Sequence, residues 1–322
     1  MPKDIPPGLK PRIQFGVPIG TAEAVPFQDV AQQRVLPQHD TPWGMGSIAT
    51  WPCPEIRPMF DLPALDAALA ATIFAGNLHF APVTDSTNSD ALAAARKGAP
   101  HGSVYLADEQ LAGRGRGDHA WHSAAGEGLY VSVLLRPKMP PVRLPLLPLA
   151  AGLAAAQAVR ESAGLTVDLR WPNDLLIGER KAAGILVEAK TSGGAVDFAV
   201  VGIGINVHQR GFDPDLSTPA TSLEIEAGRP VSRQDLLAAL LKSLQREAAG
   251  LLDPASVETI PRRVEQASSW VLGRRVEVHG PQACTGTTAG LDENGFLLVR
   301  TAEGLVRVQT GGMRAVDDLA RR

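Results

Sequence analysis

A run of glycine and arginine at residues 113–117, Gly-Arg-Gly-Arg-Gly, has the composition of an anion-binding loop. Arginine offers planar, permanently charged donors that match phosphate and carboxylate oxygens. Glycine allows positive φ and lets the backbone approach a ligand closely. The run therefore predicts a loop that holds an anion with both backbone amides and guanidinium groups. The same pattern also fits a solvated basic turn or an Arg-Gly segment that binds RNA.

The composition of the chain argues against nucleic acid as the ligand of this loop. The 322 residues carry a formal net charge of −3, which gives no bulk electrostatic reason to bind a polyanion. Aromatic residues make up only 5% of the chain, too few to indicate a stacking platform for bases. With 44% hydrophobic and 20% charged residues, the balance is that of an ordinary globular protein. We therefore expect no nucleic-acid partner.

The two cysteines, Cys53 and Cys284, are far apart and have no second Cys or His at metal-binding spacing. This argues against a disulfide framework and against a zinc site. The N-terminus lacks the apolar run of a signal peptide, and no apolar stretch is long enough to cross a bilayer without interruption. We expect a cytoplasmic protein without a membrane segment.

Residues 1–58 differ in character from the rest of the chain. They contain eleven of the 26 prolines and show no apolar periodicity. Such a composition offers little burial to offset chain entropy, so we expect disorder or a loosely attached arm. The two short amphipathic helices of a helix-turn-helix are not recognisable there. Our hypothesis is that the protein starts at Met59 and that the first 58 residues are a gene-model artefact or a dispensable extension.

Apolar patterns and turn residues predict the elements around the loop, which joins two strands. Strands are expected at residues 77–83, 101–108, 129–135, 167–171, 181–190 and 196–207. Helices are expected at residues 91–97, 146–162, 232–250 and 255–266. Beyond residue 270 the pattern predicts a small antiparallel barrel, with alternating strands at 271–278, 285–291, 296–301 and 305–309.

Two polar or glycine-rich features next to these elements have more than one interpretation. Thr87 and Asp90 have the spacing of a capping box, so the segment 86–88 could simply cap the helix that follows. Gly202 and Gly204 interrupt a strand, which indicates either a bulge or a ligand lying against the backbone.

Four stretches of the chain form an ordered set: Asp85-Ser-Thr-Asn88, residues 110–121, Arg170-Trp-Pro-Asn-Asp174 with residues 181–188, and Gly202-Ile-Gly-Ile-Asn-Val207. Their order and spacing resemble the catalytic domain of biotin protein ligases. The resemblance runs from about residue 77 to 208 and more loosely to the C-terminus. It implies an α+β fold, with a mixed-sheet catalytic domain at residues 59–269 and an SH3-like β-barrel at 270–322. Without a recognisable DNA-binding domain, it implies the enzyme-only class.

The same resemblance implies a two-step reaction with biotin, ATP and Mg²⁺. Biotin is first activated as biotinyl-5′-AMP with release of pyrophosphate, and it is then transferred to a lysine of a biotin carboxyl carrier protein. Two anions must meet in the first step, so dense positive charge is required. The intermediate hydrolyses readily, so the loop should close over it. We expect a monomer or a homodimer.

The resemblance also implies roles for individual residues. Catalysis would depend on Lys181, Arg116 and Arg114. The ureido end of biotin, which is neutral, would contact uncharged groups, and its carboxyl end the charged loop. The biotin-binding residues would be Ser86, Thr87, Asn88, Gln110, Arg114, Gly115, Arg116 and Lys181. The ATP-binding residues would be Arg116, Trp121, Asn173, Lys181 and Asn206. Asp174 would bind Mg²⁺, with positioning of ATP or Lys181 and structural capping as alternatives, and Trp121 could instead belong to the core.

Three departures from the family pattern stand out. The family loop usually reads Gly-Arg-Gly-Arg-Arg-Gly, whereas Gly117 and Asp118 occupy its last two positions here and His119 follows. The loop thus has one positive charge fewer and gains a carboxylate. Arg170 stands where lysine is more usual, and no DNA-binding domain is recognisable.

Two other functions compete with biotin ligation. A lipoate or octanoate protein ligase belongs to the same superfamily, but it would need a longer apolar tunnel and a different Gly-Arg pattern. A biotin-sensing regulator without catalysis would not need Lys181 together with paired arginines.

Overall fold

The computed structural model describes residues 60–117 and 119–316. The predictions for residues 1–58, for the start at Met59 and for Asp118 lie outside the described residues. The helices are α1 (Leu62–Ala68), α2 (Thr87–Arg96), α3 (Leu146–Ala163), α4 (Leu223–Ala227), α5 (Arg233–Gly250), α6 (Pro254–Val257) and α7 (Ile260–Gln266), with a short 3₁₀ turn at Pro141–Arg143. None of the helices among these residues is both long and apolar enough to cross a membrane.

A seven-stranded sheet organises the first part of the described chain, in the order β1-β2-β3-β7-β6-β5-β4. The β1–β2 pair is parallel and the other neighbours are antiparallel, so the sheet is mixed. The expected α+β fold is therefore confirmed. The strands are β1 (Leu78–Thr84), β2 (Val104–Gln110), β3 (Gly128–Leu135), β4 (Asp168–Arg170), β5 (Asp174–Ile177), β6 (Arg180–Ser192) and β7 (Ala195–Asn206).

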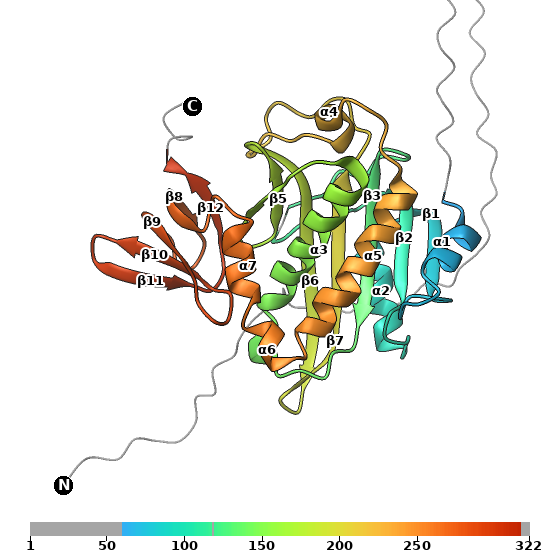
Figure 1. Ribbon diagram of the computed structural model, residues 1–322, viewed down its shortest axis with the longest axis horizontal. Coiled ribbons are helices and arrows are strands. Elements are labelled where there is room, and N and C mark those ends of the chain that lie inside the picture. The colour runs from blue at the N-terminus through green and yellow to red at the C-terminus, as the bar shows by residue number, and fades with distance from the viewer. Residues whose placement is uncertain (1–59, 118, 317–322) are drawn as a thin grey trace, which may run out of the picture. The chain divides into compact units, whose positions relative to one another are not determined.

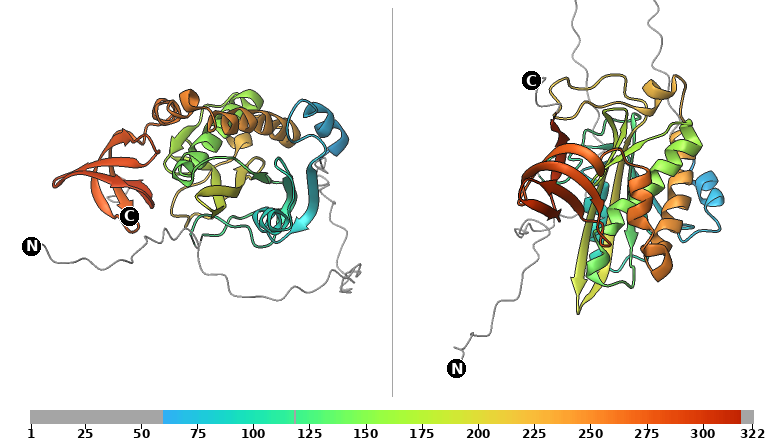
Figure 2. Two further views of the ribbon diagram at one scale, coloured as in Figure 1. Left: turned by 90° about the horizontal axis from the view of Figure 1, so that it is seen from below. Right: turned by 60° about the vertical axis from the view of Figure 1, so that its left-hand side comes forward.

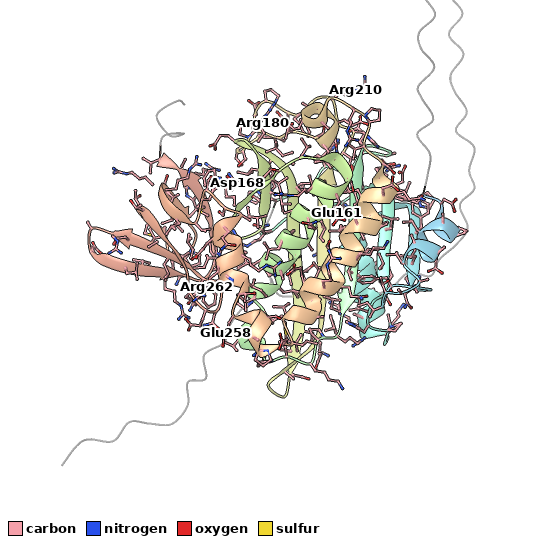
Figure 3. All side chains as sticks on the ribbon, viewed as in Figure 1. Glu161, Asp168, Arg180, Arg210, Glu258 and Arg262 are labelled. Atoms are coloured by element: carbon pink, nitrogen blue, oxygen red, sulfur yellow. The ribbon has the colours of Figure 1, made fainter. Side chains whose placement is uncertain are left out.

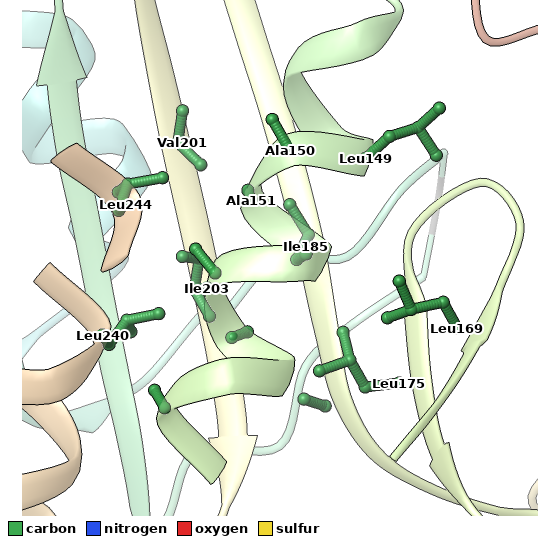
Figure 4. Packing of buried hydrophobic residues seen from close by; sticks show 14 of the residues in the cluster. Leu149, Ala150, Ala151, Leu169, Leu175, Ile185, Val201, Ile203, Leu240 and Leu244 are labelled. Carbon is green, nitrogen blue, oxygen red and sulfur yellow. The ribbon is translucent and has the colours of Figure 1, made fainter. Parts of the chain in front are cut away.

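The two faces of this sheet are covered differently (Figure 1 and Figure 2). Helices α3 and α5 pack on one face, where alternate residues of β7, among them Val201 and Ile203, join the main core (Figure 4). Helix α2 packs on the other face against Phe198 and Val200 of the same strand. Because side chains alternate along a strand, Gly202 and Gly204 face the α2 side. The α2 side is the face on which the polar residues of the central strands gather.

The C-terminal strands form a second, five-stranded antiparallel sheet in the order β11-β10-β9-β8-β12. They are β8 (Leu272–His279), β9 (Cys284–Leu291), β10 (Leu297–Thr301), β11 (Gly304–Val308) and β12 (Gly312–Ala315). This sheet lies in the same compact unit of the chain as the first one. Contacts join the two: Trp171 donates its indole N–H to the Gly295 carbonyl at 3.0 Å, and the Glu265 carboxylate of α7 accepts from the Leu291 amide at 2.8 Å.

Several local predictions were wrong, for identifiable reasons. The capping box at Thr87 does not form: α2 begins at Thr87 itself, and Asp90 accepts a hydrogen bond from the Thr84 hydroxyl instead. The predicted helix at 255–266 is divided into α6 and α7 at residues 258–259. The short elements β5, β12, α1 and α4 were not predicted, because segments of four to seven residues carry little periodicity.

The glycines of β7 do not mark a bulge. Gly202 and Gly204 pair in regular register with both neighbouring strands. A Cβ on Gly202 would lie 2.0 Å from the Asn88 Oδ1 atom, and one on Gly204 would lie 2.5 Å from the Trp121 indole. These glycines therefore leave room for side chains that stand over the sheet.

We predict that Gly202→Ala lowers the free energy of unfolding by about 1–3 kcal/mol, because the new methyl group overlaps a hydrogen-bonded Asn88 side chain. Gly211→Ala is the control, since its new Cβ would meet no atom within 4 Å and its φ is ordinary. Urea unfolding of both variants measures the difference. Equal stability of the two would contradict the assigned contact.

Candidate active site

The Gly-Arg loop folds back on itself between β2 and β3. Trp121 donates its backbone N–H to the Gly113 carbonyl at 2.8 Å, and Gly115 donates to the His119 carbonyl at 2.7 Å. A Cβ on Gly113 would lie 2.3 Å from the Trp121 carbonyl oxygen, so the close approach requires glycine. Gly117 has a φ of 65°, in the left-handed region that favours glycine. Gly117, which stands where the family loop usually has arginine, therefore occupies a turn that favours glycine.

Uncharged side chains form a connected floor beside the loop. The Thr87 hydroxyl lies 2.8 Å from the Ser132 hydroxyl, which donates to Asn88 Oδ1 at 2.6 Å. The Gln110 Oε1 atom accepts from the Thr87 backbone N–H at 2.9 Å, and its Nε2 donates to the Ser123 hydroxyl at 2.8 Å. We call these five residues the neutral floor. It is largely withdrawn from solvent, since Thr87, Asn88, Ser123 and Ser132 are all buried.

Sequence reasoning missed two members of the neutral floor, Ser132 and Ser123. Ser132 is the one polar residue in the apolar run 129–135, and that break in the pattern was the available indication. Ser86, which was predicted to bind biotin, is buried next to the floor as the N-terminal cap of α2, and its side chain makes no capping hydrogen bond.

Arg114 lies over this floor and is paired with Glu188 of β6. The guanidinium nitrogens Nη1 and Nη2 of Arg114 donate to Oε1 and Oε2 of Glu188 at 3.2 and 2.5 Å, a two-point contact. Glu188 also accepts from Asn88 Nδ2 at 3.0 Å. Glu188 was not predicted as a site residue. Glu188 follows Gly184 by four residues along β6, so its side chain projects on the same face of the sheet. This even spacing is the pattern that could have identified it.

Lys181 is held by a carboxylate from the neighbouring strand. Its Nζ atom lies 2.6 Å from Asp174 Oδ1, and Arg170 Nη2 donates to Asp174 Oδ2 at 2.6 Å. The register between β5 and β6 shifts by one residue at this point, because Leu175 pairs with Ala183 but Leu176 pairs with Lys181. This irregularity of the ladder sets the position from which the Lys181 side chain leaves the strand.

The backbone of Lys181 is also fixed, by the segment that precedes α4. Its amide donates to the Pro219 carbonyl at 2.7 Å and its carbonyl accepts from the Thr221 amide at 3.0 Å. The adjacent Arg180, labelled near α4 in Figure 3, donates to Glu226 of that helix at 3.0 Å. The ammonium group is therefore placed by both its main chain and its side-chain partner.

Asp174 stays ionised because of its two cationic partners. Burial alone would raise its pKa, but the charges and hydrogen bonds of Lys181 and Arg170 together outweigh burial and bring the pKa below the ordinary value. At neutral pH the cluster consists of two cations around one carboxylate and has a net positive charge.

Arg116 connects the Gly-Arg loop to the segment between β11 and β12. Its guanidinium donates to the Thr310 hydroxyl at 3.0 Å and to the Gly311 carbonyl. Burial lowers its pKa, and the nearby Asp174 carboxylate acts in the opposite direction.

Trp121 fills the space over the glycines of the two central strands. A Cβ atom on Gly184 would lie 3.0 Å from the Trp121 ring, and a Cβ atom on Gly204 would lie 2.5 Å from it. The Lys181 ammonium is 5.4 Å from the centroid of the same ring. The indole Nε1 is buried without a hydrogen-bond partner among the described residues. Trp121 thus packs over the two central strands beside the Lys181 ammonium. Its contact with ATP stays a prediction.

The two predicted asparagines make contacts that brace the site. Asn173 donates its side-chain N–H to the Ile185 carbonyl at 2.8 Å, and its own carbonyl accepts from the Ile185 amide at 2.9 Å. Asn206 donates to the Thr221 carbonyl at 3.0 Å and is buried. These contacts position β5 and the segment behind Lys181. Direct binding of ATP by either residue stays a prediction.

The described residues do not fit a resident magnesium site. No group of three His, Cys, Asp or Glu side chains among residues 60–117 and 119–316 could hold a metal ion. Asp174 was the predicted ligand, but each of its oxygens already faces a cation at 2.6 Å. The geometry supports the alternative role of Asp174, which is to position Lys181.

Comparison with known proteins agrees with this architecture. The profile of the biotin/lipoate A/B protein ligase family matches residues 80–206, and that of the biotin protein ligase C-terminal domain matches residues 271–312. The biotin–[acetyl-CoA-carboxylase] ligase of Mycobacterium tuberculosis is 33% identical over 268 residues, covering 80% of this chain and 96% of the relative. The chain belongs to the biotin protein ligase family. The predicted family is therefore confirmed.

Other relatives agree with this assignment. The bifunctional ligase/repressor BirA of Bacillus subtilis is 32% identical over 243 residues, which are 74% of each chain. Among solved structures, the biotin protein ligase from Aquifex aeolicus in complex with biotin and ATP is similar with a TM-score of 0.64 and 32% identity. That match covers 74% of this chain and 98% of the Aquifex chain.

We predict that Asp174→Asn lowers the free energy of unfolding at pH 7 by about 3 kcal/mol, because a largely buried Arg170 loses its counter-charge. The pKa of Asp174 is below its ordinary value of 3.8 in the folded protein, so its stabilisation is complete above about pH 4 and is lost as the pH falls through the folded pKa. Urea unfolding at pH 7 and at about pH 2.5 should therefore show a smaller gap between wild type and variant in acid. A gap that stays constant would contradict the pairing.

Proposed function

We propose that this protein is an ATP-dependent biotin protein ligase that activates biotin as biotinyl-5′-AMP and transfers it to a lysine of a biotin carboxyl carrier protein. The single observation that carries the proposal is the arrangement of the site. One face of one sheet presents an uncharged floor, and three cationic side chains, Arg114, Arg116 and Lys181, stand beside it. A ligand with a neutral polar end and a carboxylate at the other end matches this arrangement of an uncharged floor beside cationic side chains.

In the first step the carboxylate of biotin attacks the α-phosphorus of ATP. A bond forms between a carboxylate oxygen and the phosphorus, and the bond to the bridging oxygen breaks, so that pyrophosphate leaves with its electron pair. In this proposal the Lys181 ammonium and the Arg116 guanidinium offset the repulsion between the two anions and stabilise the charge that develops on the phosphorus oxygens. Mg²⁺ enters this account as part of the nucleotide substrate, whose phosphates supply its oxygen ligands.

In the second step a lysine amine of the acceptor attacks the acyl carbon of the intermediate. The new C–N bond replaces the acyl–oxygen bond, AMP leaves, and the amine loses its proton. Water must be kept from the same carbon. Trp121 and the Gly-Arg loop form the cover over the site, and the bonds from Arg116 to Thr310 and Gly311 fasten that cover to the segment between β11 and β12.

The carrier is proposed from the chemistry and from the relatives. The Mycobacterium relative is named for acetyl-CoA carboxylase as its acceptor. We propose that the acceptor here is likewise the biotin carboxyl carrier subunit or domain of a carboxylase.

Lipoate or octanoate ligation is the second candidate, because the matching family profile covers both ligase types. The neutral floor favours biotin. Its serine, threonine and amide groups can both donate to and accept from a ureido group, whereas an acyl chain offers these polar groups no hydrogen bond.

The proposal is tested with the full chain, ATP, Mg²⁺ and a purified carrier domain. Intact-mass measurement should show one biotin added to a biotin carboxyl carrier domain and none to the same domain with its target lysine changed to arginine. A parallel reaction supplies lipoate and a lipoyl domain, and intact-mass measurement shows whether that domain is modified. Modification of the lipoyl domain alone would replace biotin ligation by the second candidate.

We predict that Lys181→Ala lowers the rate of biotin activation by about 10²–10³-fold, because it removes a fixed charge beside the reacting phosphorus. Lys190→Ala is the matched control, since it removes an exposed lysine from the outer end of the same strand. Single-turnover pyrophosphate release measures both. A near-normal rate in Lys181→Ala would remove this residue from the mechanism.

A further inference from the structure

The pair between Arg114 and Glu188 places a carboxylate of the protein on the arginine that the proposed function assigns to the substrate. Both guanidinium nitrogens of one edge are engaged, at 3.2 and 2.5 Å. The side chains are partly exposed, 40% for Arg114 and 29% for Glu188, so that the pair is accessible from the site rather than sealed in the core. A carboxylate in two-point contact is also the geometry in which an arginine would receive a substrate carboxylate.

Glu188 has a second partner that does not depend on Arg114. Its Oε2 atom accepts from Asn88 Nδ2 at 3.0 Å, and Asn88 is held in turn by the Ser132 hydroxyl at 2.6 Å. Asn88 is buried and belongs to the neutral floor. If Arg114 turns toward another anion, Glu188 therefore keeps a hydrogen bond and is not left without a partner.

Two carboxylates cannot share one edge of a guanidinium group without repelling each other. We propose that Glu188 is an exchangeable counter-ion: it occupies Arg114 in the free protein and is replaced there by the carboxylate of the substrate. This inference rests on the proposed function in taking biotin as the substrate. Glu188 keeps the arginine over the site while it is empty, and it requires every ligand that engages Arg114 to carry an anionic end able to displace it.

The exchange has a measurable consequence for ligand charge. Removing the negative charge of residue 188 removes a competitor of the substrate carboxylate, so an anionic ligand should bind more tightly. A neutral analogue that makes the same floor contacts does not compete for Arg114, and its affinity should stay the same. A residue that merely supports the fold would alter the affinity for both ligands alike.

The test is Glu188→Gln, which keeps the size of the side chain and an oxygen that can accept from Asn88. Calorimetric titration of the full chain with biotin, and with biotin amide as the neutral probe, gives the two dissociation constants. We expect the dissociation constant for biotin to fall about two- to fivefold, as befits a partly exposed ion pair, and that for the amide to change less than about twofold. Asp197→Asn is the control for net charge, since it removes one carboxylate from the same sheet at its paired contact with Lys190.

Three results would overturn the inference. Weaker binding of biotin to Glu188→Gln would show that Glu188 orients Arg114 for the substrate instead of competing with it. Equal changes for biotin and its amide, or a matching change in Asp197→Asn, would show a structural or a general charge effect. Failure of the wild-type chain to bind either ligand is distinguishable from these, because it would refute the proposed function itself and with it the exchange. An unchanged thermal unfolding midpoint confirms that Glu188→Gln folds normally.

Discussion

The site depends on one constraint: cations that must meet two anionic substrates have to be held in place before either substrate arrives. Several positive side chains close together repel one another, and those withdrawn from water need a counter-charge. Two carboxylates meet this need. Asp174 holds Lys181 and Arg170, and Glu188 holds Arg114. Both carboxylates come from the same part of the sheet, so the charged region is fixed by the register of β5 and β6.

The sheet also decides what can stand above it. Glycines at positions 184, 202 and 204 leave the surface of β6 and β7 bare on the face turned toward α2, and Asn88 and Trp121 occupy that space. The opposite face carries the apolar residues that pack under α3 and α5. Along β7, Val201 and Ile203 thus join the main core, whereas Gly202 and Gly204 leave room for the site on the other face.

Much of this could be predicted from the sequence, because the chemistry lies in short ordered motifs. The Gly-Arg run, the segment around Lys181 and the glycines of β7 indicated the ligase family, and apolar runs bounded by turn residues predicted the central strands. The contributions of Glu188 and Ser132 could not be predicted in this way, because they depend on which strands are neighbours. Arg116 reaches Thr310 and Gly311 almost two hundred residues later, a contact that no local pattern contains. Asp174 was expected to bind Mg²⁺ or to position Lys181, and only the structure shows that both of its oxygens face cations.

The most direct measurement of the central claim is pyrophosphate release by the full chain from ATP and Mg²⁺ without an acceptor protein, with biotin and lipoate supplied in turn. A site that joins a neutral floor to a cluster of held cations should activate biotin and leave lipoate unreacted. One equivalent of pyrophosphate per site with biotin, and none with lipoate, is the predicted result. Release with lipoate alone, or release with neither acid, would contradict the account.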